Sequence, residues 1–70
     1  MIADIRRLIE TRPFRPFVIH IADGRELKVP HPDYVSFMQI TGRVIVQQDN
    51  GEYDILSPLL ISGVQRSGSG

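Results

Sequence analysis

Residues 12–33 read RPFRPFVIHIADGRELKVPHPD, and this stretch carries the strongest indication of the fold. On either side of Asp23-Gly24, large apolar residues recur at every second position, which is the period-two pattern of β-strands. The apolar positions are Phe17, Ile19, Ile21, Leu27 and Val29. The stretch therefore predicts a β-hairpin that turns at Asp23-Gly24 and has prolines at both ends.

The length of the loop decides which residues of the two strands face each other. A two-residue loop would place the two apolar sets on opposite faces of the hairpin. A three-residue loop of residues 22–24, with Gly24 at positive φ in a G1 bulge, places both sets on one face. The pairs that it predicts are Ile21–Arg25, Ile19–Leu27 and Phe17–Val29. We predict this bulged loop, with Gly24 intolerant of substitution, and keep the two-residue loop as the alternative.

Residues 1–11 have the periodicity of a short amphipathic helix. Its apolar stripe consists of Ile2, Ile5, Leu8 and Ile9. Pro13 should end the helix, because the residue before a proline avoids the helical conformation. Since a helix this short depends on packing, we expect it to cover one open end of the sheet. The repeated Arg-Pro-Phe of residues 12–17 predicts an extended elbow with Phe14 and Phe17 in the core, or alternatively a ligand for aromatic-lined grooves.

Short strands and turns follow the hairpin. Pro30-His31-Pro32-Asp33 breaks the second strand and predicts a corner. Further strands are predicted at residues 34–40, 44–48, 53–56 and 59–65, with Gly63 interrupting the last. Glycines mark the turns, at Gly24, Gly42 and Gly51. The register at Gly42 stays open, because either Val35 and Phe37 or Met38 and Ile40 could face inward.

The order of these elements indicates the fold class. It predicts a mainly β protein with one N-terminal α-helix, built as a small antiparallel five- or six-stranded barrel of Sm-like or SH3-like type, or as a bent sheet. Residues 1–66 form the one domain, and Ser67-Gly68-Ser69-Gly70 has the composition of a flexible tail or a vector-derived remnant.

Composition limits the function. The chain has 70 residues and no cysteine, so neither size nor disulfides stabilise it strongly, and self-association is expected. We predict a cytoplasmic protein, because the chain shows no signal peptide or membrane span and cysteine-free chains fit a reducing compartment. The eight basic and eight acidic residues balance, which argues against a dedicated nucleic-acid binder.

Two resemblances to known families follow from these motifs. The runs Pro-Phe-Arg-Pro-Phe, Ile-His-Ile-Ala-Asp-Gly-Arg, Val-Pro-His-Pro-Asp-Tyr and Gly-Arg-Val-Ile-Val are similar to a family of short uncharacterised bacterial proteins of the planctomycete type, which implies no activity. The runs at residues 19–25 and 60–64 resemble the first hairpin and the closing strand of Sm and Lsm proteins, including Hfq. That resemblance implies a ring joined edge to edge. The chain departs from the family at Pro30 and Pro32 and lacks a basic-histidine RNA motif before Leu59.

Charge is distributed unevenly along the chain. Residues 1–16 hold four arginines against two carboxylates, whereas Asp49, Glu52 and Asp54 form one acidic region. The candidate nucleic-acid-binding residues are Arg6, Arg7, Arg12, Phe14 and Arg15, which offer phosphate contacts and a stacking ring. The alternative for these arginines is a solvated helix face with pairs to the acidic region of another subunit.

Catalysis and metal binding have little support in the sequence. The residues with acid-base or metal-ligand chemistry are His20, His31, Asp23 and Asp33, and their spacing matches no zinc signature. We therefore expect no enzyme activity, no metal and no cofactor. The preferred function is a non-enzymatic module that forms homo-oligomers through edge strands or binds a protein partner. The alternative is a single-stranded RNA-binding protein.

Overall fold

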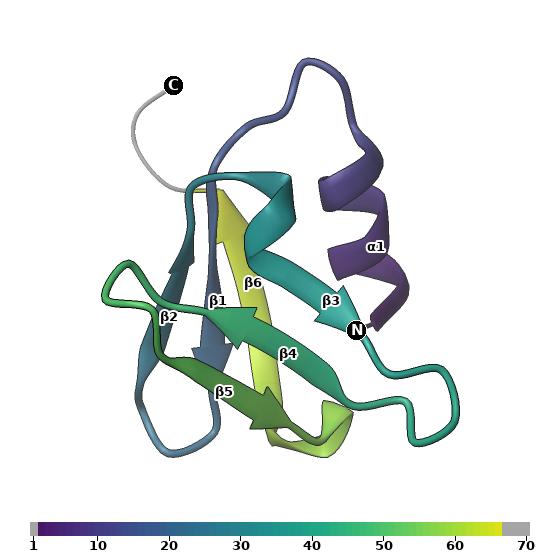
Figure 1. Cartoon of the computed structure of the whole chain (residues 1–70), viewed down its shortest axis with the longest axis vertical. Coiled ribbons are helices and arrows are strands. Elements are labelled where there is room, and N and C mark those ends of the chain that lie inside the picture. The colour runs from purple at the N-terminus through teal and green to yellow at the C-terminus, as the bar shows by residue number, and fades with distance from the viewer. Residues whose placement is uncertain (1, 67–70) are drawn as a thin grey trace.

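The computed structural model describes residues 2–66 of the chain (Figure 1). Its elements are α1 (Ile2–Glu10), β1 (Phe17–Ile21), β2 (Glu26–Val29), the 3₁₀ turn η1 (Pro32–Tyr34), β3 (Val35–Phe37), β4 (Val44–Gln47), β5 (Tyr53–Leu56), the 3₁₀ turn η2 (Pro58–Leu60) and β6 (Ile61–Arg66). Within the described residues the strands form two three-stranded antiparallel sheets, in the orders β2-β1-β6 and β3-β4-β5. The predicted mainly β architecture with one N-terminal helix is confirmed. The tail predicted at 67–70 lies outside these residues.

The hairpin of β1 and β2 has the bulged loop that the apolar pattern requires. Ile21 N–H donates to Arg25 O at 2.9 Å, Gly24 N–H donates to Ile21 O at 2.9 Å, and Gly24 has φ of 97°. Ile19 faces Leu27, as predicted. Phe17 likewise faces Val29. The three-residue loop is therefore confirmed, and both apolar sets lie on the inner face.

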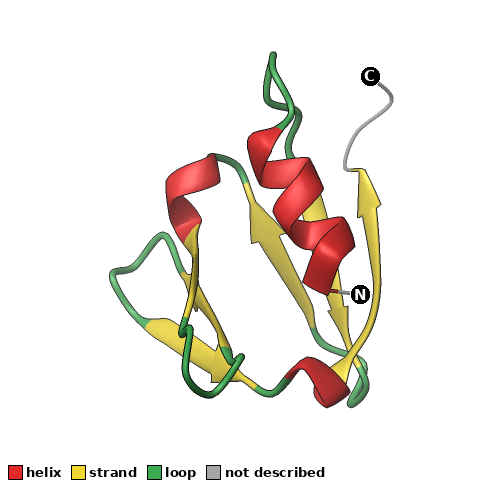
Figure 2. Ribbon diagram, turned by 90° about the vertical axis from the view of Figure 1, so that its right-hand side faces the viewer, coloured by secondary structure: helices red, strands yellow, loops and turns green. Residues whose placement is uncertain are grey.

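The inner faces of both sheets and one side of α1 form a single apolar core. Its fully or almost fully buried members are Ile5, Phe17, Ile19, Ile21, Leu27, Val29, Val35, Val44, Val46, Leu56 and Ile61. α1 lies beside both sheets (Figure 2), and Ile5 is its buried residue. The rest of the predicted stripe packs against the core while partly exposed. The helix thus covers the core because its stripe gains burial that a short isolated helix lacks.

The turn between β3 and β4 settles the open register. Met38 N–H donates to Arg43 O at 2.9 Å, and Gly42 has φ of 72°. Val35 is buried and Phe37 partly buried, whereas Ile40 is almost fully exposed. The predicted strand 34–40 was too long at both ends. Its start belongs to η1, and its end belongs to the turn, because a four-residue loop closed by the glycine leaves no ladder partners beyond Met38.

The last strand also begins later than predicted. Residues 58–60 form η2, in which Leu60 N–H donates to Ser57 O at 2.9 Å and Leu59 N–H donates to Ser57 Oγ at 3.3 Å. The serine and the proline after it favour a tight turn over an extended strand. Gly63 does not interrupt β6; instead, the pairing with β1 shifts by one residue beside it.

Candidate interaction surfaces

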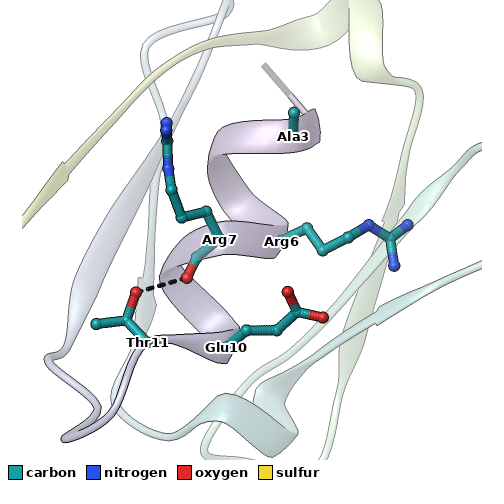
Figure 3. A pocket seen from close by; sticks show the side chains of 5 residues that line it. All are labelled: Ala3, Arg6, Arg7, Glu10 and Thr11. Atoms are coloured by element: carbon teal, nitrogen blue, oxygen red, sulfur yellow. Dashed lines mark hydrogen bonds between the residues drawn. The ribbon is translucent and has the colours of Figure 1, made fainter.

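The two arginines in the middle of α1 point in different directions (Figure 3). The guanidinium carbon of Arg6 lies 4.4 Å from the centroid of the Phe37 ring, a cation–π contact that joins α1 to β3. Arg7 forms an ion pair with Asp4 one turn earlier in the helix. Both guanidinium groups therefore already have partners within the chain.

The elbow after α1 uses its arginine and phenylalanine for local structure. Arg12 donates to the carbonyl oxygens of Ile9 at 2.6 Å and Thr11 at 3.0 Å, which satisfies acceptors at the end of the helix. The Phe14 ring is half-buried, with its centroid 6.1 Å from that of Phe17. Among residues 2–66, Arg15 is the one arginine of the predicted nucleic-acid set without a hydrogen bond, an ion pair or a ring contact. The structure therefore does not gather these five residues into one surface of free cations around an exposed ring.

The hollows beside α1 are open to solvent. One of about 360 Å³ is lined by Ala3, Arg6, Arg7, Glu10 and Thr11 (Figure 3). The Thr11 hydroxyl donates to the Arg7 carbonyl oxygen at 2.7 Å, so it does not face a general base. The hollow combines side chains of both charges, which suits a solvated helix face better than a site for one kind of ion.

The two histidines lie in separate places. His20, on the outer face of β1, has Nε2 3.1 Å from Gln65 Oε1 and Nδ1 3.5 Å from Glu26 Oε2. These contacts connect the three strands β2, β1 and β6. The His31 ring instead lies beside the Tyr34 ring in the proline corner, with centroids 5.8 Å apart. Across residues 2–66, no three histidine, cysteine or acidic side chains are grouped as metal ligands.

The acidic region has partners within the chain. Asp49 accepts a hydrogen bond from the Tyr34 hydroxyl at 2.7 Å, and this bond raises the pKa of Tyr34. Asp54 accepts from Gln48 Nε2 at 2.8 Å and lies 3.6 Å from Arg25 Nη1. The contact from Arg25 joins the tip of the first hairpin to β5. Sequence reasoning missed this contact, because the two residues are far apart in the chain.

Asp23 in the first hairpin loop gives a prediction about acid stability. The backbone N–H of Arg25 donates to Asp23 Oδ1 at 3.0 Å, and its Nε donates to Oδ2 at 2.9 Å. The backbone bond above all, and the guanidinium with it, lower the pKa of Asp23 below its ordinary 3.8. The carboxylate therefore stabilises the fold above pH 3.8, and this contribution is lost as the pH falls through the lower pKa of the folded state.

The variant Asp23→Asn tests this role of the charge. It keeps an acceptor for the Arg25 N–H but has no charge. We expect it to be less stable than the natural chain in urea at neutral pH, and equally stable well below pH 3.8. An equal difference at both pH values would contradict the role given to the charge.

Two outer strands, β5 and β6, have unpaired backbone edges. Within the described residues each has a single hydrogen-bonded neighbour. Gln48 N–H donates to Glu52 O at 2.7 Å, and hydrogen-bonded pairs alternate along an antiparallel ladder. Asp54 is therefore bonded to β4, whereas the N–H and C=O groups of Tyr53 and Ile55 point to the free edge.

The same alternation identifies the free groups of β6. The bond from Ile21 N–H to Arg25 O starts the ladder of β1. Because Ile21 bonds to β2, alternation directs the backbone groups of Val18 and His20 to β6, where they face Gln65 and Gly63. The backbone groups of Val64 and Arg66 therefore point away from β1. The remaining outer strands, β2 and β3, follow one another through the proline corner. β2 carries the charged residues Glu26 and Lys28, and β3 has only three residues, two features that protect edges from pairing.

Comparison with known proteins identifies no relative. No protein-family model, no curated protein and no solved structure matches the chain. None of the helices in the part of the chain described here is long and apolar enough to cross a membrane.

Proposed function

We propose that this protein is a non-enzymatic, homo-oligomerising interaction module in which β5 of one copy pairs with β6 of the next. The observation that carries this proposal is the free edge of β5, where Tyr53 and Ile55 direct their backbone groups outward. These two residues are 63% and 49% exposed, and both are large and uncharged, so the edge is also apolar. An exposed apolar edge strand is a template for pairing with another chain.

The second edge supports a closed assembly. β6 has six residues, the longest of the strands in the described part, and offers the outward groups of Val64 and Arg66. β5 and β6 are different surfaces, so their contact is heterologous. Repeated contacts of this kind close into a ring when the rotation between copies permits it.

The Sm-like or SH3-like barrel belongs to the same proposal. In that arrangement β2 and β3 are the two halves of one strand that bends at the corner of Pro30 and Pro32, which leaves five strands. The order of the elements favours it, since η2 leads from β5 to β6 and β6 returns to β1. We place the module in the cytoplasm, because a chain without cysteine has no disulfide bonds that the reducing conditions there would break.

Single-stranded RNA binding through the N-terminal arginines has weaker support. Arg6, Arg7 and Arg12 already contact other groups of the chain, and Phe14 is half-buried. An RNA surface needs cations that are free to meet phosphates and rings that are free to stack on bases. We therefore prefer association between protein subunits.

The edge contact is tested with Ile55→Pro and Ile55→Ala. Both variants remove the exposed side chain, but only proline removes the outward N–H, and the bonds to β4 remain in each. We expect light scattering to show a smaller assembly for Ile55→Pro at concentrations where Ile55→Ala remains assembled. Circular dichroism should show that both variants are folded.

Two results would contradict the edge contact. One is a natural chain that stays monomeric at millimolar concentration. The other is an equal effect of the two variants, because the backbone N–H would then contribute nothing.

A further inference from the structure

The loop between β4 and β5 is a tight turn built on Asn50-Gly51. Gln48 N–H donates to Glu52 O at 2.7 Å, and Gly51 N–H donates to Gln48 O at 3.1 Å. Gly51 has φ of 89°, a left-handed conformation that glycine adopts readily. Asn50 is the one asparagine of the chain, and both residues of the dipeptide are exposed to solvent. Any reaction of an asparagine side chain in this protein therefore takes place in this turn.

The side-chain amide of Asn50 is bonded to Glu52 through both of its polar atoms. Glu52 N–H donates to Asn50 Oδ1 at 2.9 Å, and Asn50 Nδ2 donates to Glu52 Oε1 at 2.8 Å. Flipping the amide would set donor against donor and acceptor against carboxylate, so the two bonds fix its orientation. The nitrogen of the amide thus serves as the donor for the Glu52 carboxylate.

The loop between β1 and β2 has an aspartate at the equivalent position before its glycine. Arg25 N–H donates to Asp23 Oδ1 as Glu52 N–H does to Asn50, but there the Arg25 guanidinium also donates to the carboxylate, at 2.9 Å. An acid is therefore paired with an arginine in one loop, and an amide with a glutamate in the other. A carboxylate in place of the Asn50 amide would meet the carboxylate of Glu52 where a donor now lies.

An asparagine that precedes a glycine can lose its amide without an enzyme. The backbone nitrogen of the glycine, after a base removes its proton, attacks the side-chain carbonyl carbon of the asparagine. The side-chain carbon–nitrogen bond breaks, and the nitrogen takes up a proton and leaves as ammonia. Water then opens the resulting succinimide ring at either carbonyl carbon, which gives aspartate or isoaspartate. Glycine favours the attack because no Cβ shields its nitrogen.

The folded turn opposes this attack at both reacting groups. The N–H of Gly51 is bonded to Gln48 O, and the amide of Asn50 is held by Glu52. These bonds must break before the nitrogen of Gly51 can reach the side-chain carbon of Asn50. Exposed turns open locally at low cost in free energy, and a reaction of the open form proceeds at a rate set by its population.

We propose that Asn50 is a modification site, which reacts with Gly51 to form aspartate and isoaspartate at a rate that its hydrogen bond to Glu52 limits. The product destabilises the turn, because an anionic oxygen replaces the Nδ2 donor beside Glu52 Oε1 and like charges repel at this distance. Isoaspartate also lengthens the backbone within the turn. The inference does not depend on the edge pairing proposed above, since all the reacting groups belong to one chain.

The rate is tested with Glu52→Ala and its matched control Glu52→Gln. Both remove the carboxylate, but glutamine keeps an oxygen that accepts from Asn50 Nδ2. Mass spectrometry of the tryptic peptide 44–66 after incubation at neutral pH measures the conversion and the isoaspartate formed. In native buffer we expect Glu52→Ala to react about fivefold faster than the natural chain, and Glu52→Gln within about twofold of it. In concentrated urea all three chains should react at one higher rate, because the turn is open in each.

The effect of the product is tested with Asn50→Asp, which stands for the aspartate form. Its midpoint in urea at neutral pH should be lower than that of the natural chain. Adding Glu52→Gln should recover most of this loss, since it removes the second carboxylate.

Four results would contradict the proposal. The site is excluded if the natural chain does not react in urea, or reacts without forming isoaspartate. Protection by the turn is excluded if the natural chain reacts as fast in native buffer as in urea, and the role of the hydrogen bond is excluded if Glu52→Ala and Glu52→Gln react equally. An Asn50→Asp midpoint equal to that of the natural chain excludes the destabilising effect.

Discussion

Phe17→Ala is expected to lower the free energy of unfolding by about 3–5 kcal/mol, the usual cost of removing a buried aromatic ring. Phe17 is fully buried in the shared core, on the central strand of its sheet. A domain of this size retains only about 3–5 kcal/mol of net stability, so the variant should be largely unfolded. Urea titration followed by far-ultraviolet circular dichroism measures the change.

The neighbouring ring provides the control for this substitution. Phe14 precedes the strand and is half-buried, so Phe14→Ala should cost about 1–2 kcal/mol. Phe17→Leu leaves a smaller cavity than Phe17→Ala and should stay folded. Its loss in the free energy of unfolding should lie between the losses of Phe14→Ala and Phe17→Ala. Equal losses for Phe14→Ala and Phe17→Ala would show that the core is not centred on β1.

Gly24→Ala is expected to cost about 1–2 kcal/mol, because its φ of 97° is unfavourable for a residue with a Cβ atom. A Cβ at this position would meet no atom within 4 Å, so the cost comes from the backbone and not from a clash. The bulged loop keeps Ile19 opposite Leu27, and a loop that avoids positive φ would bring other residues together.

Gly63→Ala is the control for Gly24→Ala. It shows the effect on stability of replacing a glycine that does not have positive φ. Gly63 lies in β6 without positive φ, and a Cβ there also meets no atom within 4 Å. This variant should leave the stability unchanged or raise it by up to about 1 kcal/mol, since alanine restricts the unfolded chain. A loss as large as that of Gly24→Ala would contradict the argument. Thermal unfolding of both variants in one buffer makes the comparison.

Local patterns in the sequence predicted the first hairpin because two short-range requirements agree there. The alternation of apolar residues defines one buried face, and only a loop with Gly24 at positive φ aligns that face on both strands. The stripe of α1 follows from helical periodicity in the same way. Errors arose where capping and turn bonds compete with strand patterns, at residues 38–40 and at Leu59 and Leu60.

The candidate arginine surface shows why site prediction was harder. The sequence places Arg6, Arg7, Arg12 and Arg15 close together, but it does not reveal which of them find partners. Phe37 lies far from Arg6 in the chain, yet the packing of α1 on β3 brings their side chains together. Contacts of this kind depend on how elements pack, which local periodicity does not encode.

The sequence by itself determined the hairpin, its register and the apolar side of the helix, because these depend on alternation and on a single glycine. Tertiary structure alone decided that β6 returns to β1, that β5 and β6 keep free edges within residues 2–66, and that Ile45 and Ile55 face outward from the sheet β3-β4-β5. Alternation separates the two sides of a strand, but both Ile45 and Val46 are apolar. Which of them is buried depends on where the other sheet lies, and that is set by contacts between residues distant in the chain.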